Sequence, residues 1–242
     1  MTNILGERRN NSVLEKTLNI ISPIKNKFSK PDCRVHIFIQ ENAMNSLWLN
    51  GYYEVYEFFY SYKKTINQGV VWADQDLKCY CHFFNTFTNK GLPGVDDNAL
   101  TLAIKYYDYA IDFFYEDDIY QSMFYLGAAC HLVQDVTVPQ HATGDLLNNH
   151  MQFENYAKAN YLKIKRFRIY SEPILFNSVE EYIRFNSYNA IKNQHMYKHV
   201  QNLSTRFYLI AEKALEFSQQ TTAGILILYF KNTYMQNYKN QI

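Results

Sequence analysis

The chain has 242 residues, of which 48% are hydrophobic and 17% aromatic. A chain of this length and composition can bury one full core, which excludes a disordered or low-complexity protein. Its 24 basic and 23 acidic side chains leave a net charge of +1, so no long-range field attracts nucleic acid or an anionic membrane. We therefore expect no nucleic-acid partner, and we expect a monomer.

Neither a membrane span nor a signal peptide is visible in the sequence. No apolar run approaches the roughly 18 residues that a membrane span needs. The apolar stretch over residues 18–24 is too short and too polar for a secretory signal peptide. The sequence thus predicts no transmembrane segment, and the absent signal peptide favours a cytoplasmic location.

Apolar residues recur at intervals of three and four, and Pro and Gly cluster between these segments, which predicts an all-α protein. Between residues 69 and 94 the period fails, so we expect a long loop there, and loops of that length are usually functional. The segment over 164–175 could be extended. Helices are expected over residues 32–48, from 51 into the sixties, and over 97–114, 119–136, 149–163, 179–197 and 203–234.

The densest set of chemically reactive side chains lies around one proline. His131 and Asp135 stand four apart, which places both on the same face of a helix. Pro139 disfavours helix at the residue before it, so the helix should end just after Asp135 and present His141 from the turn beyond. Imidazole and carboxylate groups are good zinc donors. This segment therefore offers three candidate metal ligands.

A second pair repeats the same spacing. His150 and Glu154 are also four apart on the next predicted helix, so two helices could bring donors to one cavity. Asp74 and His82, in the predicted loop, supply two further donors. A single pair of this kind is usually a salt-bridged surface pair, whereas two pairs with additional histidines favour a metal centre.

The pattern FYLG-x3-H-x3-D-x3-P-x-H, from Phe124 to His141, resembles the bacterial zinc-dependent phospholipases C. That family includes the phosphatidylcholine-cleaving enzymes and the catalytic domains of clostridial alpha-toxins. The resemblance implies one compact multi-helix catalytic domain over residues 31–242, after an N-terminal extension over 1–30 of unassigned role. Further matches are WAD-x7-H at Trp72 to His82, H-x3-E at His150 and Glu154, His36 in an early helix, and Thr222-Ala223-Gly224.

The resemblance also implies a role for each donor, with two or three Zn²⁺ ions as cofactors. Asp135 would bridge two ions, and Asp74 would be the general base that takes a proton from the attacking water. The implied ligands are Asp74, His82, His131 and Asp135 for the first ion, His141, His150 and Glu154 for the second, and His36 with Asp135 for the third.

These residue types suit phosphodiester hydrolysis on physical grounds as well. Zinc lowers the pKa of bound water from about 15.7 toward about 7, which supplies a nucleophile at neutral pH. Ions about 3.5 to 4 Å apart can hold the phosphate oxygens and stabilise the attacking and leaving oxygens. A bridging carboxylate such as Asp135 offsets the repulsion between two neighbouring cations.

The third ion is where this sequence departs from the family. Mature family enzymes begin with a tryptophan whose amine and carbonyl complete that site, but no tryptophan here precedes Trp48. Three alternatives are open: a substitute ligand such as Cys33 or Asp32, processing that creates a new terminus near residues 23–33, or only two ions. Family members are typically secreted, so the location is open between cytoplasm and exterior.

The leading functional hypothesis is hydrolysis of a phospholipid to diacylglycerol and a phosphorylated headgroup, with contact to a membrane surface. One alternative is a single-strand-specific zinc nuclease, but the second site of those enzymes usually pairs His with Asp rather than with a residue such as Glu154. The other is a zinc-stabilised scaffold, or a family member recruited to another intracellular reaction. Asp74 argues against a silent scaffold.

Overall fold

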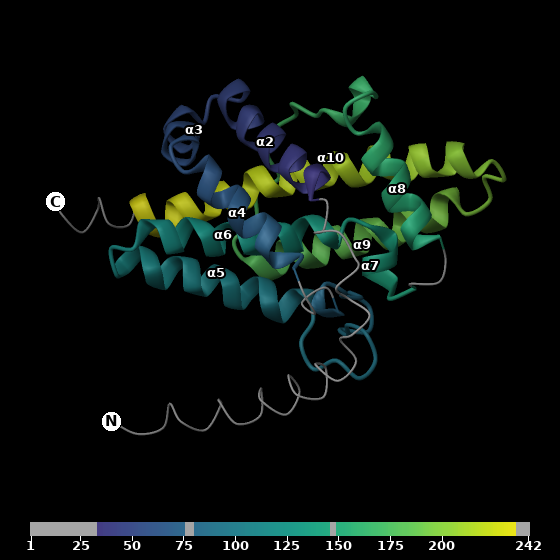
Figure 1. The fold of residues 1–242 in the computed structure, drawn as a ribbon, viewed down its shortest axis with the longest axis horizontal. Helices are drawn as coiled ribbons and strands as arrows, with labels where there is room; N and C mark the ends of the chain where they lie inside the picture. Colours follow the sequence, from purple (N-terminus) through teal and green to yellow (C-terminus); the bar gives the residue numbers. More distant parts are fainter. Residues whose placement is uncertain (1–32, 76–79, 146–148, 236–242) are drawn as a thin grey trace. The chain divides into compact units, whose positions relative to one another are not determined.

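Helix α6 (Ile119–Asp135) runs through the middle of the helical assembly, with α4 (Lys63–Ala73) and α5 (Ala99–Tyr115) packed along it (Figure 1). Every residue from Leu126 to Asp135 is buried. A helix that is surrounded on all sides becomes apolar all round, and its remaining polar side chains need partners inside the protein. This is the helix that carries His131 and Asp135.

Two glycines let α4 and α6 approach until their backbones touch. A Cβ atom on Gly127 would lie 2.0 Å from the Ile66 carbonyl oxygen, and one on Gly69 would lie 1.8 Å from the Phe124 carbonyl oxygen. No side chain fits in either space, so glycine is required at both positions. The close contact brings the end of α4, where Asp74 follows, beside the donors of α6.

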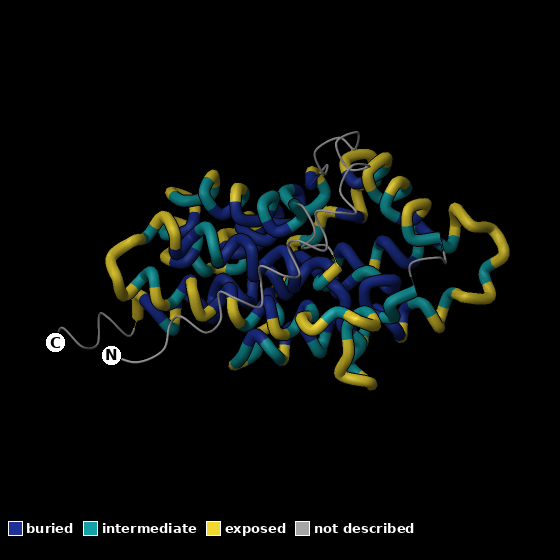
Figure 2. Tube along the Cα trace, turned by 60° about the horizontal axis from the view of Figure 1, so that its bottom comes forward, coloured by how far each residue is buried: buried dark blue, intermediate teal, exposed yellow. Residues whose placement is uncertain are grey.

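The longest helix, α10 (Leu203–Phe230), packs against α2 (Arg34–Leu49) and α9 (Val179–Tyr197). All of its residues from Thr221 to Phe230 are buried. The buried parts of the helices gather in the interior, and exposed residues lie at the periphery (Figure 2). Because α2 packs against both α10 and α6, its first turn, which carries His36, lies next to α6.

The structure, a computed structural model, describes residues 33–75, 80–145 and 149–235. Within these ranges the regular structure is helical and the only β-type pairing is one isolated bridge, Asn85 with Lys90, so the predicted all-α class is confirmed. Residues Cys33–Ile242 cluster as one unit. The predicted extension over 1–30 lies outside the described residues, and its boundary stays a prediction.

The remaining elements are α3 (Tyr53–Tyr60), α7 (Pro139–Thr143), α8 (His150–Asn160), a 3₁₀ turn at Lys165–Phe167 and a π-helical turn at Lys231–Met235.

Several predicted boundaries were wrong, for physical reasons. The helix expected from residue 51 onward is two helices, α3 and α4, with a turn at Ser61 and Tyr62. The loop expected from Gly69 begins only after Ala73, because Gly69 is a packing glycine within α4 and not a helix breaker. The segment over 164–175, which we expected could be extended, has extended backbone at Ile164 and Arg168 but forms a 3₁₀ turn at Lys165–Phe167 between them. None of the described helices is long and apolar enough to cross a membrane.

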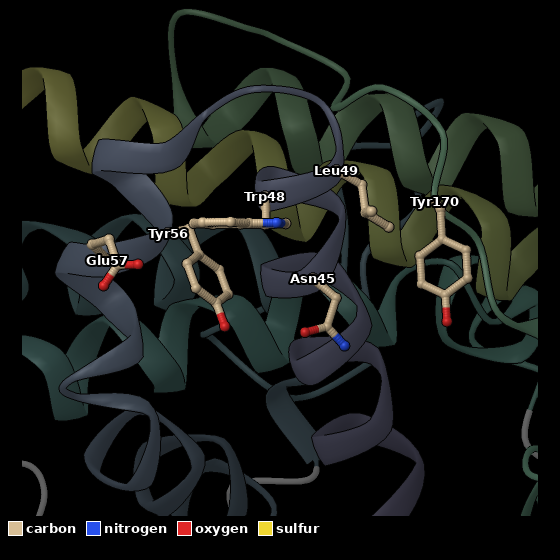
Figure 3. Close-up of a pocket in the computed structure, with 6 residues that line it drawn as sticks. All are labelled: Asn45, Trp48, Leu49, Tyr56, Glu57 and Tyr170. Carbon is tan, nitrogen blue, oxygen red and sulfur yellow. The ribbon is translucent and has the colours of Figure 1, made fainter.

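A groove of about 500 Å³ lies beside the C-terminal end of α2 (Figure 3). Trp48 in its wall is about 18 Å along the helix from His36, at a rise of about 1.5 Å per residue. The groove is therefore separate from the predicted metal donors. Its lining consists of Asn45, Trp48, Leu49, Tyr56, Glu57 and Tyr170.

Candidate metal centre

The eight predicted donors reach one region from four helices and from the segment that connects α4 to α5. All eight fall into three groups whose ligand atoms lie within 4.8 Å of one another. Their assignment as ligands stays a prediction, but their convergence is a property of the fold. His36 is in the first turn of α2, Asp74 follows α4, His82 precedes α5, His131 and Asp135 are on α6, His141 is on α7, and His150 and Glu154 are on α8.

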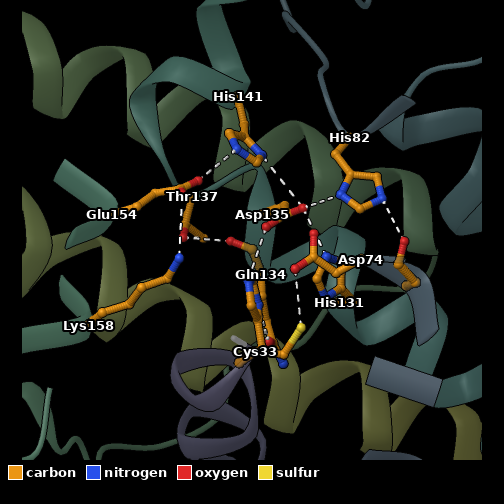
Figure 4. Close-up of polar contacts among 12 residues, drawn as sticks. Cys33, Asp74, His82, His131, Gln134, Asp135, Thr137, His141, Glu154 and Lys158 are labelled. Carbon is orange, nitrogen blue, oxygen red and sulfur yellow. Dashed lines mark hydrogen bonds and ion pairs between the residues drawn. The ribbon is translucent and has the colours of Figure 1, made fainter. Parts of the chain in front are cut away.

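The first group consists of Asp74, His82 and His131, with Asp135 close by (Figure 4). His82 Nδ1 lies 2.7 Å from Asp135 Oδ2, and His131 Nε2 lies 3.1 Å from the same oxygen. His82 Nε2 donates a hydrogen bond to the Ala73 carbonyl at 3.1 Å, which leaves the Nδ1 lone pair for the centre. Donor atoms of Asp74, His82, His131 and Asp135 thus lie around one potential metal site.

The second group is formed by His141, His150 and Glu154. His150 Nε2 lies 2.9 Å both from His141 Nε2 and from Glu154 Oε1, and the third edge, from His141 Nε2 to Glu154 Oε1, is 3.8 Å. Ligand atoms on a tetrahedral zinc ion with bonds of about 2.0 to 2.1 Å are roughly 3.3 Å apart. The three observed separations bracket that value, so the group fits one zinc ion.

His141 reaches this group from α7 and not from an open turn, which corrects the sequence-based expectation. Pro139 is the first residue of α7, where its missing N–H costs no hydrogen bond. The short helix is tied to the segment before α5 because Phe84 N donates to the His141 carbonyl at 3.0 Å. His141 Nδ1 also lies 3.6 Å from Asp135 Oδ2, so Asp135 adjoins two groups.

The third group is His36, His131 and Asp135. His36 Nε2 lies 3.3 Å from Asp135 Oδ1, and its ring lies 4.2 Å from that of His131, centroid to centroid. His131 belongs to the first group as well. Asp135 therefore faces one histidine with Oδ1 and three others with Oδ2, which is the position a bridging carboxylate would occupy.

Sequence reasoning missed Gln134, which orients His36. The side-chain oxygen of Gln134 accepts a hydrogen bond from His36 Nδ1 at 3.0 Å, so His36 Nε2 is left as the donor atom toward Asp135. The Gln134 amide nitrogen donates to Gln40 Oε1 at 3.3 Å and to Thr222 Oγ1 at 3.2 Å. The available signals were its place beside Asp135 and the position of Thr222 in a matched motif.

One buried nitrogen at the centre, Nδ1 of His131, has neither a hydrogen-bond nor an ion-pair partner among the described residues. Nε2 of His131 and Nδ1 of His141 face the Asp135 carboxylate, at 3.1 and 3.6 Å. An unpaired buried polar group costs about 1 to 3 kcal/mol, so native proteins rarely leave one without a partner. Lone pairs of imidazole and carboxylate are also what zinc binds. The residues present therefore fit a set of zinc ions.

The charges of the centre are strongly coupled. Burial alone would raise the pKa of Asp135, but the imidazoles of His131 and His141 outweigh it and hold that pKa well below its ordinary value. Burial opposes charge on His141, yet Asp135 and Glu154 raise its pKa to about 10. Burial, together with His131, lowers the pKa of His36 to about 4. The centre thus holds anionic carboxylates that favour added positive charge.

Cys33, a candidate substitute ligand, lies in the wall of the centre. It is 4% exposed, and its Sγ donates a hydrogen bond to Asp74 Oδ2 at 3.1 Å (Figure 4). Burial, with the Asp74 carboxylate second, raises the pKa of the thiol, which is therefore neutral in the metal-free chain. The other candidate, Asp32, lies outside the described residues.

Comparison with known proteins places the fold and the family. The structure is similar to an alpha-toxin from Clostridium absonum, with a TM-score of 0.71 and 17% identity over 81% of this chain. It is also similar to the Clostridium perfringens alpha-toxin of avian strain SWCP, with a TM-score of 0.61 and 18% identity over 82% of this chain. The chain spans 63% of the length of each toxin. At these identities the likeness concerns the fold.

A search of curated protein sequences gave no match. The family model described as zinc dependent phospholipase C matches residues 35–217, most of the chain, and that segment contains all eight predicted donors. The chain therefore belongs to the zinc-dependent phospholipase C family.

Proposed function

We propose that this chain is a zinc-dependent phosphodiesterase whose substrate is a phospholipid, cleaved to diacylglycerol and a phosphorylated headgroup. The observation that carries the proposal is the convergence of three donor groups, linked through His131 and Asp135, inside the segment that matches the family. Family membership supports phospholipid hydrolysis at the level of the family. Bound zinc would supply a nucleophilic water at neutral pH and neutralise charge on the phosphate.

The chain's own residues would hold the ions and position the phosphate. Asp135 would join the groups as a bridging carboxylate, while Ala73 and Gln134 keep His82 and His36 in the required ring orientation. Lys158 Nζ lies 3.8 Å from Glu154 Oε2 and would steady that carboxylate from the outer side. Preorganised groups of this kind need no rearrangement during the reaction.

Asp74 is proposed as the general base. It follows the last residue of α4, is only half-buried, and has a partner for one carboxylate oxygen in the Cys33 thiol. In the proposed step, the water oxygen attacks phosphorus and its proton passes to the Asp74 carboxylate. The bond from phosphorus to the glycerol oxygen breaks, and that oxygen takes a proton from solvent to give the hydroxyl of diacylglycerol. A base needs hydrogen-bond reach to that water, and the position of Asp74 in the first donor group supports this.

The test is an Asp74→Asn variant, assayed on a soluble phosphodiester and on phosphatidylcholine vesicles, with zinc measured by elemental analysis. The amide keeps an oxygen donor but cannot take a proton, so we expect activity to fall about 10²- to 10⁴-fold with most zinc retained. Asp112→Asn, at an exposed position on α5, should behave as the parent chain.

Three other outcomes would change the assignment. Unchanged activity in Asp74→Asn would remove Asp74 from the role of base. A parent chain that binds zinc and cleaves neither substrate would favour the zinc-stabilised scaffold. Cleavage of single-stranded nucleic acid, with both phosphodiester substrates left intact, would favour the nuclease, although Glu154 in the second group supports the phospholipase.

A further inference from the structure

The groove beside the C-terminal end of α2 has three aromatic side chains in its wall (Figure 3). Trp48 comes from α2, Tyr56 from α3, and Tyr170 from the segment between α8 and α9. Trp48 is 46% exposed and Tyr170 is 48% exposed, so neither ring is covered by the core. The volume of about 500 Å³ is within the usual range for small-molecule sites, about 300 to 1,000 Å³. These rings are therefore available to a ligand.

The backbone around the groove fixes the positions of the rings. Gly51, with a φ of +83°, adopts the left-handed conformation in the turn that leads from α2 into α3. After this turn Tyr56 meets Trp48 edge to face, with ring centroids 5.3 Å apart. The Asn50 side-chain amide donates a hydrogen bond to the Tyr170 carbonyl at 3.1 Å, which ties the third segment to the end of α2. A site assembled in this way loses little freedom when it binds a ligand.

A carboxylate without a counter-ion lies in the same groove. Glu57 lines it, and no basic side chain pairs with Glu57 among the described residues. Glu41 on α2, by contrast, is paired with Lys63 Nζ at 2.8 Å. Elsewhere in the described chain Arg184 lies 5.5 Å from the centre of the Phe84 ring, but no described basic side chain lies over a ring of the groove. The groove thus offers negative charge and aromatic faces, and the described residues supply no cation to it.

The chemistry of the lining selects one class of ligand. Aromatic faces carry negative electrostatic potential and attract cations, and a carboxylate strengthens this attraction. An anion would be repelled by Glu57, and a purely apolar ligand would cover that carboxylate without pairing it. A primary ammonium ion is compact and strongly hydrated, whereas the methyl groups of a quaternary ammonium ion pack directly against aromatic rings. The lining therefore fits a quaternary ammonium group best.

We propose that this groove binds a quaternary ammonium group, with Trp48, Tyr56 and Tyr170 around the methyl groups and Glu57 beside the positive charge. The site is about 18 Å along α2 from His36 and shares no residue with the proposed metal centre. The proposal therefore does not depend on bound zinc. A soluble amine and the headgroup of phosphatidylcholine present the same group to the groove.

The test is a titration of the full chain with choline and with its neutral isostere, in which a tert-butyl group replaces the trimethylammonium group. Tryptophan fluorescence follows binding, since the chain has two tryptophans and Trp48 borders the groove. The other, Trp72, is packed against Tyr106 and Phe124. We expect choline to bind with a Kd of about 1 mM and the isostere at least about 10-fold more weakly. Equal affinity for both probes, or no saturable binding of choline, would overturn the proposal.

Two variants place the bound choline in the groove. Glu57→Gln should weaken choline binding about 2- to 5-fold and leave binding of the isostere as it is. Glu54→Gln, at an exposed position of the same helix outside the groove, is the matched control and should bind choline as the parent chain does. Trp48→Leu keeps an apolar side chain without an aromatic face, so choline affinity should fall about 10-fold.

Nuclear magnetic resonance of the choline methyl protons measures binding where the fluorescence of Trp48 is lost. Methyl groups over aromatic faces are shifted upfield, and this shift should disappear in Trp48→Leu. Full choline affinity in both Trp48→Leu and Glu57→Gln would show that choline binds elsewhere on the chain, which would overturn the proposal even though binding is observed.

Sedimentation with phosphatidylcholine vesicles distinguishes the two sources of the cation. If the headgroup is the ligand, the parent chain should sediment with the vesicles, Glu57→Gln should do so less, and added choline should release both. A chain that binds free choline but stays in solution would take a soluble ammonium compound, and the groove would remain the cation site. Choline binding that persists in Asp74→Asn would support the groove whether or not the chain is a hydrolase.

Discussion

At the scale of single residues, the proposed centre depends on side chains that are not among the predicted ligands. Gln134 holds His36 in one ring orientation, and Gln40 and Thr222 in turn hold Gln134. Outer partners of this kind fix which ring nitrogen is protonated and which carries the lone pair for the metal. His36 therefore cannot be treated as a donor on its own.

Replacing Gln134 should weaken the site that includes His36. We expect Gln134→Ala to lower the affinity for one zinc ion by about 10- to 100-fold, since His36 Nδ1 loses its acceptor. Competition with a chromophoric chelator measures this affinity ion by ion. Gln121→Ala, an exposed glutamine on the same helix, is the control and should leave all affinities as they are. Equal loss in both variants would contradict a role in orientation.

The raised pKa of His141 predicts that zinc binding releases protons. With a pKa of about 10, His141 in the metal-free chain carries a proton at neutral pH, whereas a zinc ligand must be neutral. Zinc affinity should thus fall as pH is lowered from about 8 to about 6, because protons compete better. Calorimetry in two buffers of different ionisation heat should show a buffer-dependent enthalpy. An enthalpy that is the same in both buffers would contradict the prediction.

At the scale of elements, the contact between α4 and α6 sets the distance between donors. Gly69 and Gly127 place the two helices in backbone contact, and Asp74 extends from the end of one toward His131 on the other. A side chain at either glycine has to separate the helices, because the obstructing atoms are carbonyl oxygens of the backbone. Packing and metal geometry are therefore linked through these two positions.

The substitution Gly127→Ala should destabilise the chain by at least about 2 kcal/mol, since overpacking a close interface usually costs about 1 to 3 kcal/mol. Urea unfolding followed by circular dichroism measures the change. Gln68→Ala, at an exposed position of α4 next to Gly69, should change stability by less than about 0.5 kcal/mol. If Gly127→Ala proved as stable as the parent chain, the helices would have to be farther apart than the contact between Gly127 and the Ile66 carbonyl indicates.

At the scale of the whole molecule, zinc would act as a clamp on the helices. The donors come from α2, α6, α7 and α8 and from segments that flank α4 and α5, so the ions would cross-link most of the bundle. Without zinc, His131 remains fully buried with an unpaired ring nitrogen. The hydrophobic core between the helices is separate from the centre and should keep the helices formed.

Removal of zinc by a chelator should therefore lower the melting temperature while most helix remains at 25 °C. A ligand present at about 100 times its Kd stabilises the folded state by about 2.7 kcal/mol. For a chain of this size that corresponds to roughly 5 to 10 °C. Thermal unfolding with and without chelator, followed by readdition of zinc, checks this. A melting temperature that does not move although zinc has left would contradict the role as clamp.

Several features could be predicted from the sequence because they are local. The four-residue spacing of His131 and Asp135, and of His150 and Glu154, places each pair on one helix face whatever the rest of the chain does. Apolar periodicity likewise indicated the helical class. Boundaries were less predictable, since a glycine such as Gly69 can end a helix or allow another helix to approach, and only the neighbour distinguishes these cases.

Only the tertiary structure decided which donors belong to the same candidate metal site. His36 and His131 lie 95 residues apart in the sequence, and the two rings meet because α2 packs against α6. The hydrogen bond from Cys33 to Asp74 and the position of Gln134 behind His36 arise in the same way. The sequence by itself determined the helical class and the identity of the donor pairs, because these depend on spacing within one helix. Packing between helices decided the grouping of the donors and the number available to each site.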